Sequence, residues 1–465
     1  MQRRPIAALC PLPSVAFEGI LAIIRISLLA ALLLSTSATP ALAQDAEMSA
    51  AIEADWDGHL AALFEHFHRN PELSFMEVKT AARMAEELRE AGADVTENVG
   101  GTGVVGMLRN GEGPLVMLRA DMDGLPLKED SGLAYASTVT QVDADGVEYP
   151  VMHACGHDSH ITALVGIARY LAAHTDKWSG TVMLVVQPAE ERLGGARAML
   201  EDGLYERFGK PDYALGFHSA AGAPVGTINV PDSNNLFSSS SDAVDIVVHG
   251  VGAHGAYPHA GRDPVYIGAE IVTGLQSVVS REVSPLQPSV ITVGMFNAGT
   301  KRNIIPDRAD LQLTVRSNDP AVRAQLLEAI ERVAVNTARG HGIAEDMLPE
   351  VIRQYGTPPG INNDALARRL DAALRGAFDE ETVVVTKQSG MGAEDFAYFI
   401  TEETGVPGYF FSIGSTPLED IEAAANGGPA VPSHHSPFFR IDGEATVTLG
   451  AKALITAVMD LAPPQ

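Results

Sequence analysis

The amino-acid sequence predicts an α/β protein with a larger domain and a smaller domain inserted into it. Apolar runs of strand length alternate with helical patterns in the first and last parts of the chain, as in a largely parallel sheet. The middle of the chain follows the order strand, helix, strand, strand, helix, strand, which is typical of a ferredoxin-like α+β domain. The length of 465 residues allows about two to three domains with large cores.

The larger domain begins with a predicted helix. Ser74 and Glu77 have the spacing of a capping box, so we expect a helix from Val78 that stops at Gly92. Its expected inner face consists of Val78, Ala81, Ala82, Ala85 and Leu88. Buried strands are expected over 104–108, 115–120, 182–186 and 213–217, with a helix over 161–171. A strand, a helix and a further strand in this order predict parallel pairing.

The inserted domain is expected over residues 239–352, after the small polar stretch Ser238–Ser241, whose composition suits a hinge. Its predicted strands are 243–248, 290–296, 309–316 and 350–355, and its predicted helices are 264–281 and 321–339. Pro358-Pro359-Gly360 marks the return to the larger domain, which comprises residues 44–238 and 353–465. Helices over 365–378 and 445–459 and strands over 383–386 and 409–413 are expected there.

The first 43 residues have the pattern of a secretory signal peptide. Arg3, Arg4 and Arg25 supply positive charge, Ile26–Leu34 is an apolar run, and Ala41-Leu42-Ala43 fits a cleavage site. A membrane anchor is the alternative, but Arg25 interrupts the apolar stretch and the run after it is too short to cross a bilayer. We therefore expect cleavage near Ala43, a periplasmic or secreted protein, and no stable membrane span after cleavage.

Charge and cysteine content exclude two classes of protein. Lys and Arg number 32 against 59 Asp and Glu, a net charge of −27, and removal of the leader would change it to −29. A nucleic-acid binder needs a basic surface, so nucleic acid is excluded as a partner. The two cysteines, Cys10 and Cys155, cannot form a disulfide framework. After cleavage Cys155 remains alone, as a buried filler, a reactive thiol or a metal ligand.

Two motifs that resemble ligand sites are interpreted as turns. Gly101-x-Gly103-x-x-Gly106 matches a dinucleotide fingerprint, but no strand is expected before it, and 104–108 predicts a strand where the fingerprint needs a helix. Asp143-Ala144-Asp145-Gly146 resembles part of a calcium loop but lacks the third ligand and the closing Glu. We therefore expect a turn at the first motif and a hairpin at the second.

Candidate metal ligands lie near the ends of predicted strands. Cys155 and His157 are two residues apart before a helix, and Gly156 lets the loop bend so that both can face one point. Glu190 and Glu191 follow the strand 182–186, and adjacent carboxylates in apolar surroundings are costly unless a cation or a proton offsets them. A buried structural cluster is the alternative for Cys155 and His157, and a solvated pair is the alternative for the two glutamates.

Histidines supply further candidates at the same edge. His218 ends the strand 213–217, and the pair His434-His435 lies between Pro432 and Pro437 in a stiff loop. A lone histidine at a strand end is more often structural, and spacing alone does not prove a site built from distant segments.

Six segments, in the same order along the chain, resemble motifs of the M20 metallopeptidase clan. They fit its amidohydrolase branch, the hydrolases of N-acyl, hippurate and indole-acetyl amino acids. The segments are Pro71–Phe75, Leu118–Pro126, Met152–His157, Gln187–Glu191, Met391–Phe396 and His435–Pro437. The resemblance covers essentially the whole chain after residue 43. It implies a zinc-peptidase-like α/β catalytic domain with an inserted ferredoxin-like lid, in agreement with the patterns above.

The resemblance also implies metal ligands and a catalytic base. The matched ligands are Cys155, His157, Glu191, His218 and His435. His435 is chosen over His434 because it directly precedes the Ser-Pro of the motif. Glu190 matches the catalytic base, and Asp123 matches a supporting aspartate beside the catalytic centre. Two divalent ions are implied, with Zn as the default from Cys and His ligation and Mn, Co or Ni as alternatives.

Three lid residues match substrate-binding positions of the family. His254, in Gly252-Ala253-His254, matches a histidine that reaches the substrate across the closed cleft, often from a partner subunit. Asn303 and Arg316 resemble residues that hold the substrate carboxylate, for which the fork of an arginine is suited. The alternatives are a turn cap for Asn303 and a surface ion pair for Arg316. The resemblance further implies a homodimer through the lid.

The implied reaction is hydrolysis of a small N-acyl amino acid or short peptide by metal-activated water, with Glu190 as proton acceptor and donor. A carboxypeptidase or dipeptidase of the same clan is the close alternative. A non-catalytic periplasmic binding protein is the alternative of another class, although it would have no reason to keep Glu190-Glu191 beside a metal cluster.

Two departures from the family pattern are a longer stretch around Val142–Glu148 and the replacement of the usual Gly before Thr314-x-Arg316-Ser317.

Overall fold

The computed structural model describes the backbone of residues 39–465 and the side chains from Ala46 onward. The predicted signal peptide, residues 1–43, falls almost entirely outside the described residues. Helix α2 (Thr39–Asp55) comes first, and residues 51–465 form one compact unit. Within the described part of the chain, no helix combines the length and hydropathy needed to cross a bilayer.

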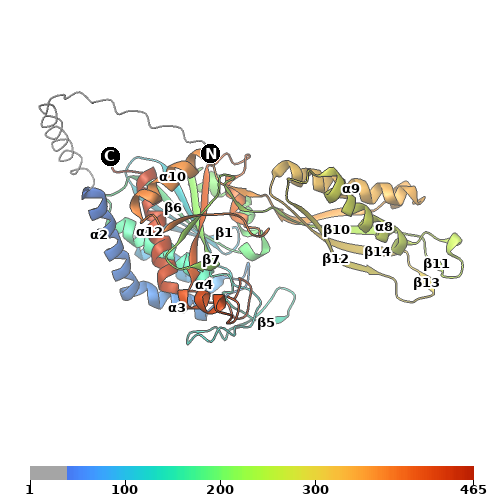
Figure 1. Ribbon diagram of the computed structural model, residues 1–465, viewed down its shortest axis with the longest axis horizontal. Helices are drawn as coiled ribbons and strands as arrows, with labels where there is room; N and C mark the ends of the chain where they lie inside the picture. Colours follow the sequence, from blue (N-terminus) through green and yellow to red (C-terminus); the bar gives the residue numbers. More distant parts are fainter. Residues whose placement is uncertain (1–38) are drawn as a thin grey trace, which may run out of the picture. The chain divides into compact units, whose positions relative to one another are not determined.

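The larger domain is built on an eight-stranded mixed sheet (Figure 1). Its strands, in spatial order, are β1 (Asp94–Val99), β2 (Gly103–Asn110), β6 (Gly180–Gln187), β3 (Leu115–Asp121), β7 (Tyr213–Pro224), β18 (Gly408–Thr416), β8 (Ile228–Pro231) and β17 (Val383–Thr386). The central strands β6, β3, β7 and β18 are parallel, as predicted. β1 pairs antiparallel with β2, β2 with β6, and β8 with β18, whereas β17 is parallel to β8, so the expectation of a largely parallel sheet holds for the centre and for the β8–β17 pair.

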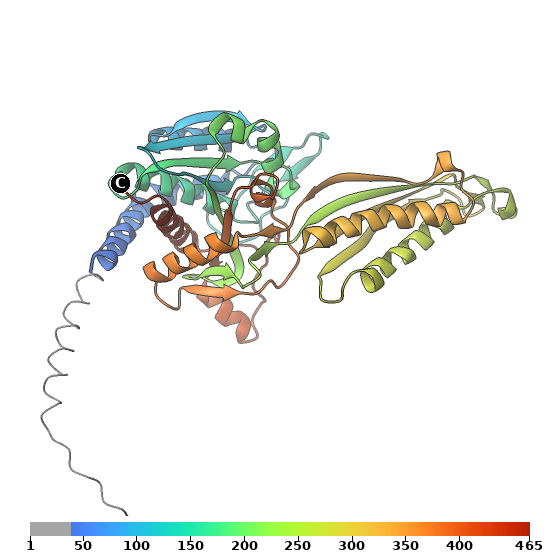
Figure 2. The ribbon, with the colours of Figure 1, turned by 90° about the horizontal axis from the view of Figure 1, so that it is seen from above.

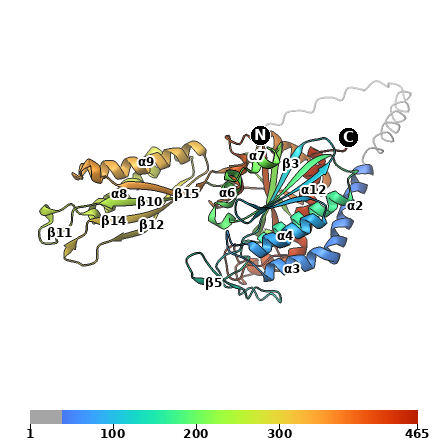
Figure 3. The same cartoon turned by 180° about the vertical axis from the view of Figure 1, so that it is seen from behind.

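Helices cover both faces of this sheet. On one face α3 (Ala61–Arg69), α4 (Val78–Glu90), α5 (His157–Ala173) and α12 (Gly443–Leu461) pack together, and α10 (Asp364–Ala377) packs on α12 (Figure 3). On the other face lie α6 (Gly195–Glu201), α7 (Leu204–Phe208) and the 3-10 helix Asp395–Ile400, which bury an apolar cluster that includes Met117, Met183 and Phe396. Helix α5 is buried along almost its whole length because helices and sheet enclose it, which holds its first residue, His157, rigidly.

The predicted capping box before α4 is wrong. The helix starts at Val78 as expected, but neither Ser74 nor Glu77 caps it with a side chain. The Ser74 hydroxyl donates instead to the buried Asp123 at 2.6 Å, and the carboxylate of Glu72 accepts the N–H groups of Lys79 and Thr80 at the start of the helix. Val78 and Ala82 are exposed, and Met84 takes part in the buried face in their place.

The inserted segment forms a four-stranded antiparallel sheet with two helices. Its strand order is β12 (Ser289–Ala298), β14 (Arg308–Ser317), β10 (Ser241–His249) and β15 (Glu350–Thr357). Helices α8 (Pro264–Ser277) and α9 (Pro320–Gly340) pack on the sheet (Figure 2). This is the predicted β-α-β-β-α-β order, with β15 running to Thr357 and a π-helix over Val278–Glu282 extending α8.

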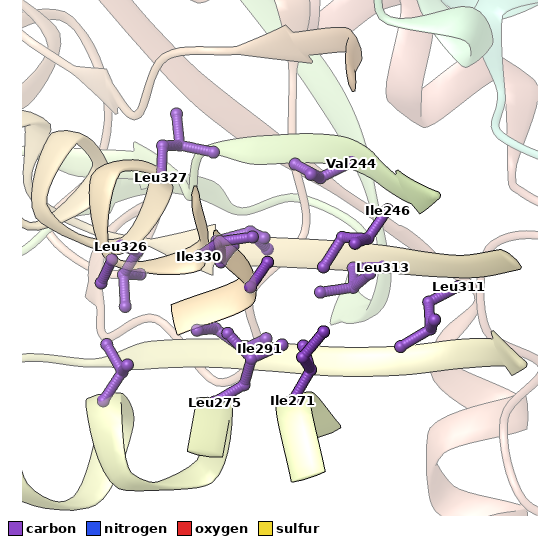
Figure 4. Packing of buried hydrophobic residues seen from close by; sticks show 14 of the residues in the cluster. Val244, Ile246, Ile271, Leu275, Ile291, Leu311, Leu313, Leu326, Leu327 and Ile330 are labelled. Carbon is purple, nitrogen blue, oxygen red and sulfur yellow. The ribbon is translucent and has the colours of Figure 1, made fainter. Parts of the chain in front are cut away.

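The core of the inserted segment lies between its sheet and its helices. Ile246, Leu311 and Leu313 from the strands meet Ile271 and Ile330 from the helices (Figure 4). Asp263 and Asp319 cap the two helices with their side chains, and each precedes a proline at the first helical position. Alternate side chains of β10 and β14 point into this core, and the side chains between them point to the opposite face of the sheet.

Two turn predictions have different outcomes. The segment Asp143–Gly146 does connect a hairpin, β4 (Thr140–Val142) with β5 (Glu148–Pro150). The expectation that no strand precedes Gly101 is wrong, because β1 ends at Val99 and forms a hairpin with β2. The exclusion of a dinucleotide loop still holds, because a strand and not a helix follows these glycines.

Candidate metal centre

The candidate centre lies where the central parallel strands end. Asp121, the last residue of β3, lies opposite Gln187, the last residue of β6, and β7 carries His218 beside them. Because parallel strands end at one edge of a sheet, the segments that follow β3 and β6 meet there. The loop before α5 and the loop of His434 and His435 complete the centre.

Four overlapping groups of potential ligand atoms, each within 4.8 Å, connect all five predicted ligands. The groups are Cys155 with Glu191 and His435, Cys155 with His218 and His434, His157 with Glu190 and Glu191, and His157 with Asp121, His160 and His218. Cys155, His157, Glu191 and His218 each occur in two groups. The chain therefore brings together, from four separate segments, the five side chains that the sequence pattern named.

The loop before α5 presents Cys155 and His157 to the centre. Gly156 between them has φ +84°, and a Cβ atom there would lie 2.4 Å from the Ser219 hydroxyl, so glycine is required. The Cys155 sulfur lies 3.5 Å from Nε2 of His218. Burial raises the pKa of the Cys155 thiol well above its ordinary value, and the carboxylates of Glu191 and Glu190 raise it further. A thiolate at this position consequently needs a cation beside it.

His157 is completely buried and points one ring nitrogen into the centre. Its Nδ1 donates to the backbone carbonyl of Asp123 at 2.9 Å. Its Nε2 has no hydrogen-bond partner. Burial lowers the pKa of His157, but Asp121 and Asp123 outweigh burial and raise the pKa to about 10, so Nε2 carries a proton that a bound cation would displace. A ring held through Nδ1 with a free Nε2 is the usual arrangement of a histidine ligand.

Asp123 fixes the turn that carries the two glutamates. Its carboxylate accepts the backbone N–H groups of Glu190 and Glu191, each at 3.1 Å, and the Ser74 hydroxyl. Burial raises the pKa of Asp123, but His157 and the Ser74 hydroxyl outweigh burial and hold the pKa below its ordinary value. The turn is strained at Ala189, which has φ +51°. Asp123 therefore acts on the centre through the backbone of the turn.

Glu190 and Glu191 enter the centre differently. Burial and the neighbouring carboxylates of Glu394 and Glu191 raise the pKa of Glu190 well above its ordinary value, which suits a group that accepts and returns a proton. Glu191 lies 3.4 Å from Nε2 of His435 through Oε2, and its buried Oε1 has no partner. The unpartnered oxygen of Glu191 and the unpartnered nitrogen of His157 are atoms that a cation would satisfy.

Ser219 orients two histidines through one carbonyl. The carbonyl of Ser219 accepts Nδ1–H of His218 at 2.7 Å and Nε2–H of His434 at 3.1 Å. Since a carbonyl only accepts, His218 keeps the unprotonated Nε2 toward Cys155. Burial lowers the pKa of His218 to about 4 and that of His434 to about 3, so both rings are neutral. His435, at φ +63°, is held by a bond from its N–H to the carbonyl of Ala154.

The sequence interpretation did not include a buried charge network beneath the ligands. Arg119 donates to Asp121 at 2.7 Å and to Glu394 and Asp395 at 2.7 and 3.2 Å. Asp121 also accepts from Nδ1 of His160 at 2.5 Å. Arg119 and Asp121 lie in the segment Leu118–Pro126, and the two other carboxylates lie in Met391–Phe396. Within these two motifs the sequence pattern assigns a role only to Asp123, so their match to the family was the one signal that pointed to the other four residues.

The predicted lid residues do not lie among the ligands. His254 is exposed in the short strand β11 (Ala253–His254), which pairs with β13 (Ile304–Ile305) next to the exposed Asn303. Figure 3 shows β11 at the end of the inserted segment opposite the ends of β10 and β15 that connect to the rest of the chain. Arg316 lies on the face of β14 that turns away from the lid core, is half-buried, and donates to the Ser241 hydroxyl.

The donor set fits two divalent cations. One sulfur, several imidazole nitrogens and carboxylate oxygens converge, and two buried polar atoms among them are unpartnered. Sulfur and imidazole ligands suit zinc, while imidazole and carboxylate ligands also suit other first-row metals. The buried carboxylates carry more negative charge than Arg119 offsets, which a pair of cations would balance.

A parallel-sheet edge with this ligand set, next to a buried glutamate of raised pKa, defines a metal-dependent hydrolase of the zinc-peptidase type. Residues 117–427 match the model of peptidase family M20/M25/M40, and the chain belongs to this family. It is accordingly a metal-dependent amidohydrolase that acts on C–N bonds.

Known relatives cover most of the chain. It is 38% identical over 347 residues to the hippurate hydrolase of Campylobacter jejuni, across 74% of this chain and 86% of that protein. It is 36% identical over 365 residues to thermostable carboxypeptidase 2 of Saccharolobus solfataricus, across 78% and 86%. The solved structure of the Bacillus subtilis YXEP protein, a dinuclear metal-binding peptidase of the M20 family, matches with a TM-score of 0.69 and 28% identity, across 87% and 98%.

Proposed function

We propose that the protein hydrolyses N-acyl amino acids to a carboxylic acid and a free amino acid. The observation that carries the proposal is Glu190, a buried carboxylate that belongs to one ligand group with His157 and Glu191. The similarity to a hippurate hydrolase supports the choice of substrate class. Zinc is the proposed metal, with manganese, cobalt or nickel as alternatives.

Cys155, His157, Glu191, His218 and His435 would hold the two ions. Ions bound there would lower the pKa of a water and polarise the carbonyl of the scissile amide. Glu190 would accept the proton of that water and deliver it to the leaving amine. Asp123 would keep the Glu190–Glu191 turn in place through its two backbone hydrogen bonds.

The lid, proposed as residues 239–352 between catalytic segments 44–238 and 353–465, would complete the site. Arg316 and Asn303 would bind the substrate carboxylate, and His254 would stabilise the oxyanion. Because His254 and Asn303 lie at the far end of the lid, we propose that they act in a homodimer, in which one protomer's lid serves its partner's centre.

Export is a separate proposal. The leader pattern over residues 1–43 supports cleavage near Ala43 and a periplasmic or secreted enzyme. Expression of the full chain, followed by N-terminal sequencing of the protein from each cell fraction, tests it. A mature N-terminus beginning at Gln44 outside the cytoplasm is the expected result, and an intact cytoplasmic chain would contradict it.

The function is tested with metal-reconstituted protein and a panel of N-acetyl, N-benzoyl and dipeptide substrates. Turnover of the N-acyl amino acids with release of free amino acid is expected. Exclusive turnover of dipeptides, or of peptides from the carboxyl end, would favour the second candidate, a carboxypeptidase or dipeptidase. The similarity to a carboxypeptidase supports that candidate. Tight binding without any turnover would favour a binding protein.

A further inference from the structure

Glu77 links two strained segments that meet beside the metal centre. Its side chain is completely buried, and its Oε1 accepts the backbone N–H of Phe75 at 2.9 Å and that of Ala189 at 2.9 Å. Its Oε2 accepts the hydroxyl of Thr102, so three separate segments converge on one carboxylate. A buried carboxylate that accepts two backbone N–H groups is a strong constraint on both.

Both backbone donors lie at residues with left-handed conformations. Phe75 has φ +62° and Ala189 has φ +51°. This conformation is unfavourable for a residue with a Cβ atom, so surrounding contacts must hold it. Glu77 supplies such a contact for each of the two residues through the same oxygen atom.

The two segments are also joined through a second carboxylate. Ser74, directly before Phe75, donates to Asp123, and Asp123 accepts the N–H groups of Glu190 and Glu191, directly after Ala189. Glu77 and Asp123 thus bind the same two segments at neighbouring residues. Among the interactions described, Glu77 binds the N–H of Ala189 at the start of the turn, and Asp123 binds the N–H groups of the next two residues, Glu190 and Glu191.

We infer that Glu77 is a positioning residue, which holds the left-handed turn at Ala189 so that Glu190 and Glu191 enter the metal centre in register. The inference rests on the proposed roles of Glu190 and Glu191. It assigns a role to Glu77, which the sequence pattern predicts as part of a capping box with Ser74.

The acceptor atom, and not the charge, is what this role requires. Burial and Asp123 raise the pKa of Glu77 to about 7, and Oε1 can accept both N–H groups whether or not Oε2 carries a proton. A glutamine retains an acceptor oxygen at the same distance, and Thr102 can then accept from the amide. A leucine of similar size retains the volume but no acceptor.

The test compares Glu77→Gln with Glu77→Leu in the metal-loaded enzyme. We expect Glu77→Leu to speed amide exchange in a peptide covering residues 188–194 by about tenfold. We also expect it to lower kcat by about 100-fold with a smaller change in KM, as for a misplaced catalytic group. Glu77→Gln is expected to stay within about threefold of the parent in both measurements.

A second substitution separates positioning from general damage. Ala189→Gly removes the cost of the left-handed conformation, so Glu77→Leu combined with Ala189→Gly should recover about tenfold in kcat over Glu77→Leu. Ala189→Gly alone supplies the reference for this comparison. A purely structural loss at residue 77 would not be repaired by a glycine in a distant segment.

Glu72 offers a matched control in the same segment. It is also buried, and its carboxylate accepts the N–H groups of Lys79 and Thr80 at 2.8 Å, away from the turn. Glu72→Leu should lower the Tm without speeding exchange over residues 188–194. If Glu77→Leu does not fold, Glu77→Asp replaces it, because the shorter side chain cannot reach both donors.

Unchanged exchange and unchanged kcat in Glu77→Leu, or in Glu77→Asp in its place, would overturn the inference. Equal losses in Glu77→Gln and Glu77→Leu would also overturn it, since charge and not the acceptor would then matter. The exchange measurement is independent of the reaction. If Glu190→Gln retained turnover while Glu77→Leu loosened the turn, the proposed function would fail and the coupling of Glu77 to the turn would stand.

Discussion

Arg119 donates from Nη2 to Oε1 of Glu394 at 2.7 Å, and this bond joins strand β3 to a segment 275 residues further along the chain. The same guanidinium binds Asp121 and Asp395, and none of its side-chain surface is exposed. Asp121 in turn binds His160 and lies in a ligand group with His157 and His218. The bond therefore connects Glu394 to Arg119, which in turn binds Asp121 of the metal centre.

Replacement of Arg119 by methionine should strongly destabilise the protein. The change leaves Asp121, Glu394 and Asp395 buried without their shared cation, and loss of one partner of a buried pair typically costs about 3–5 kcal/mol. Urea unfolding measures the change. Arg109→Met is the control, because Arg109 forms an exposed pair with Asp94 and its loss should cost under about 1 kcal/mol. Equal midpoints for the two variants would contradict the prediction.

Replacement of Glu190 by glutamine should abolish most turnover and leave the metal in place. Glutamine has the same size but cannot accept the proton, which is expected to lower kcat by about 100- to 10,000-fold. Elemental analysis should show the same metal content as the parent. Glu419→Gln makes the same chemical change on the exposed helix Leu418–Ala425, and it serves as the control because it should leave kcat unchanged. Retained turnover in Glu190→Gln would remove Glu190 as the base.

The two adjacent histidines should differ in their effect on metal content. His435 forms a ligand group with Cys155 and Glu191, whereas His434 directs Nε2–H to the carbonyl of Ser219. His435→Ala should therefore lose about half of the bound metal, since one of the two ions loses a ligand. His434→Ala should retain most of it. The reverse result, measured by elemental analysis after dialysis, would assign ligation to His434.

His68 should stabilise the protein in a pH-dependent way. Its Nδ1 lies 2.6 Å from Asp158 and its Nε2 lies 3.0 Å from Glu129. Burial lowers the pKa of His68, but both carboxylates outweigh burial and raise the pKa to about 9. Because the folded pKa exceeds the unfolded value of about 6.5, the contribution is complete below pH 6.5 and is lost as pH rises through about 9.

The corresponding experiment compares the parent with His68→Gln by urea unfolding from pH 6 to pH 10. The difference in unfolding free energy should shrink by on the order of 3 kcal/mol across this range. Matched measurements on His249→Gln, whose ring pairs with Glu350 on the exposed side of β10, should show little change. A difference for His68→Gln that stays constant with pH would rule out a protonated His68.

Most of the fold could be predicted because its elements are local patterns. The runs 115–120, 182–186 and 213–217 are apolar except for Arg119, and the structure contains them as the largely buried strands β3, β6 and β7. The helices 161–171 and 321–339 were recognisable from their spacing for the same reason. Strand β1 was missed, because its residues Asp94–Val99 are mostly exposed and carry no apolar run.

The candidate ligands were also recognisable, but only as separate motifs. Cys155 and His157 are neighbours in sequence, whereas His435 lies 280 residues after Cys155 and meets it only through folding. Asp121 and His160 were overlooked as part of the centre because an aspartate in a strand and a histidine in a helix carry no distinguishing pattern. Ser74 and Glu77 were misread, because their spacing is equally compatible with capping and with bonds to distant segments.

The order of helices and strands and the residue types that meet at the centre could be predicted from the sequence, since they depend on short-range periodicity and on motif chemistry. Tertiary structure alone decided which partner each polar side chain takes. Burial removes water as an alternative partner, so Glu77 and Asp123 must bind whichever donors the packing brings near, and those donors come from other segments of the chain.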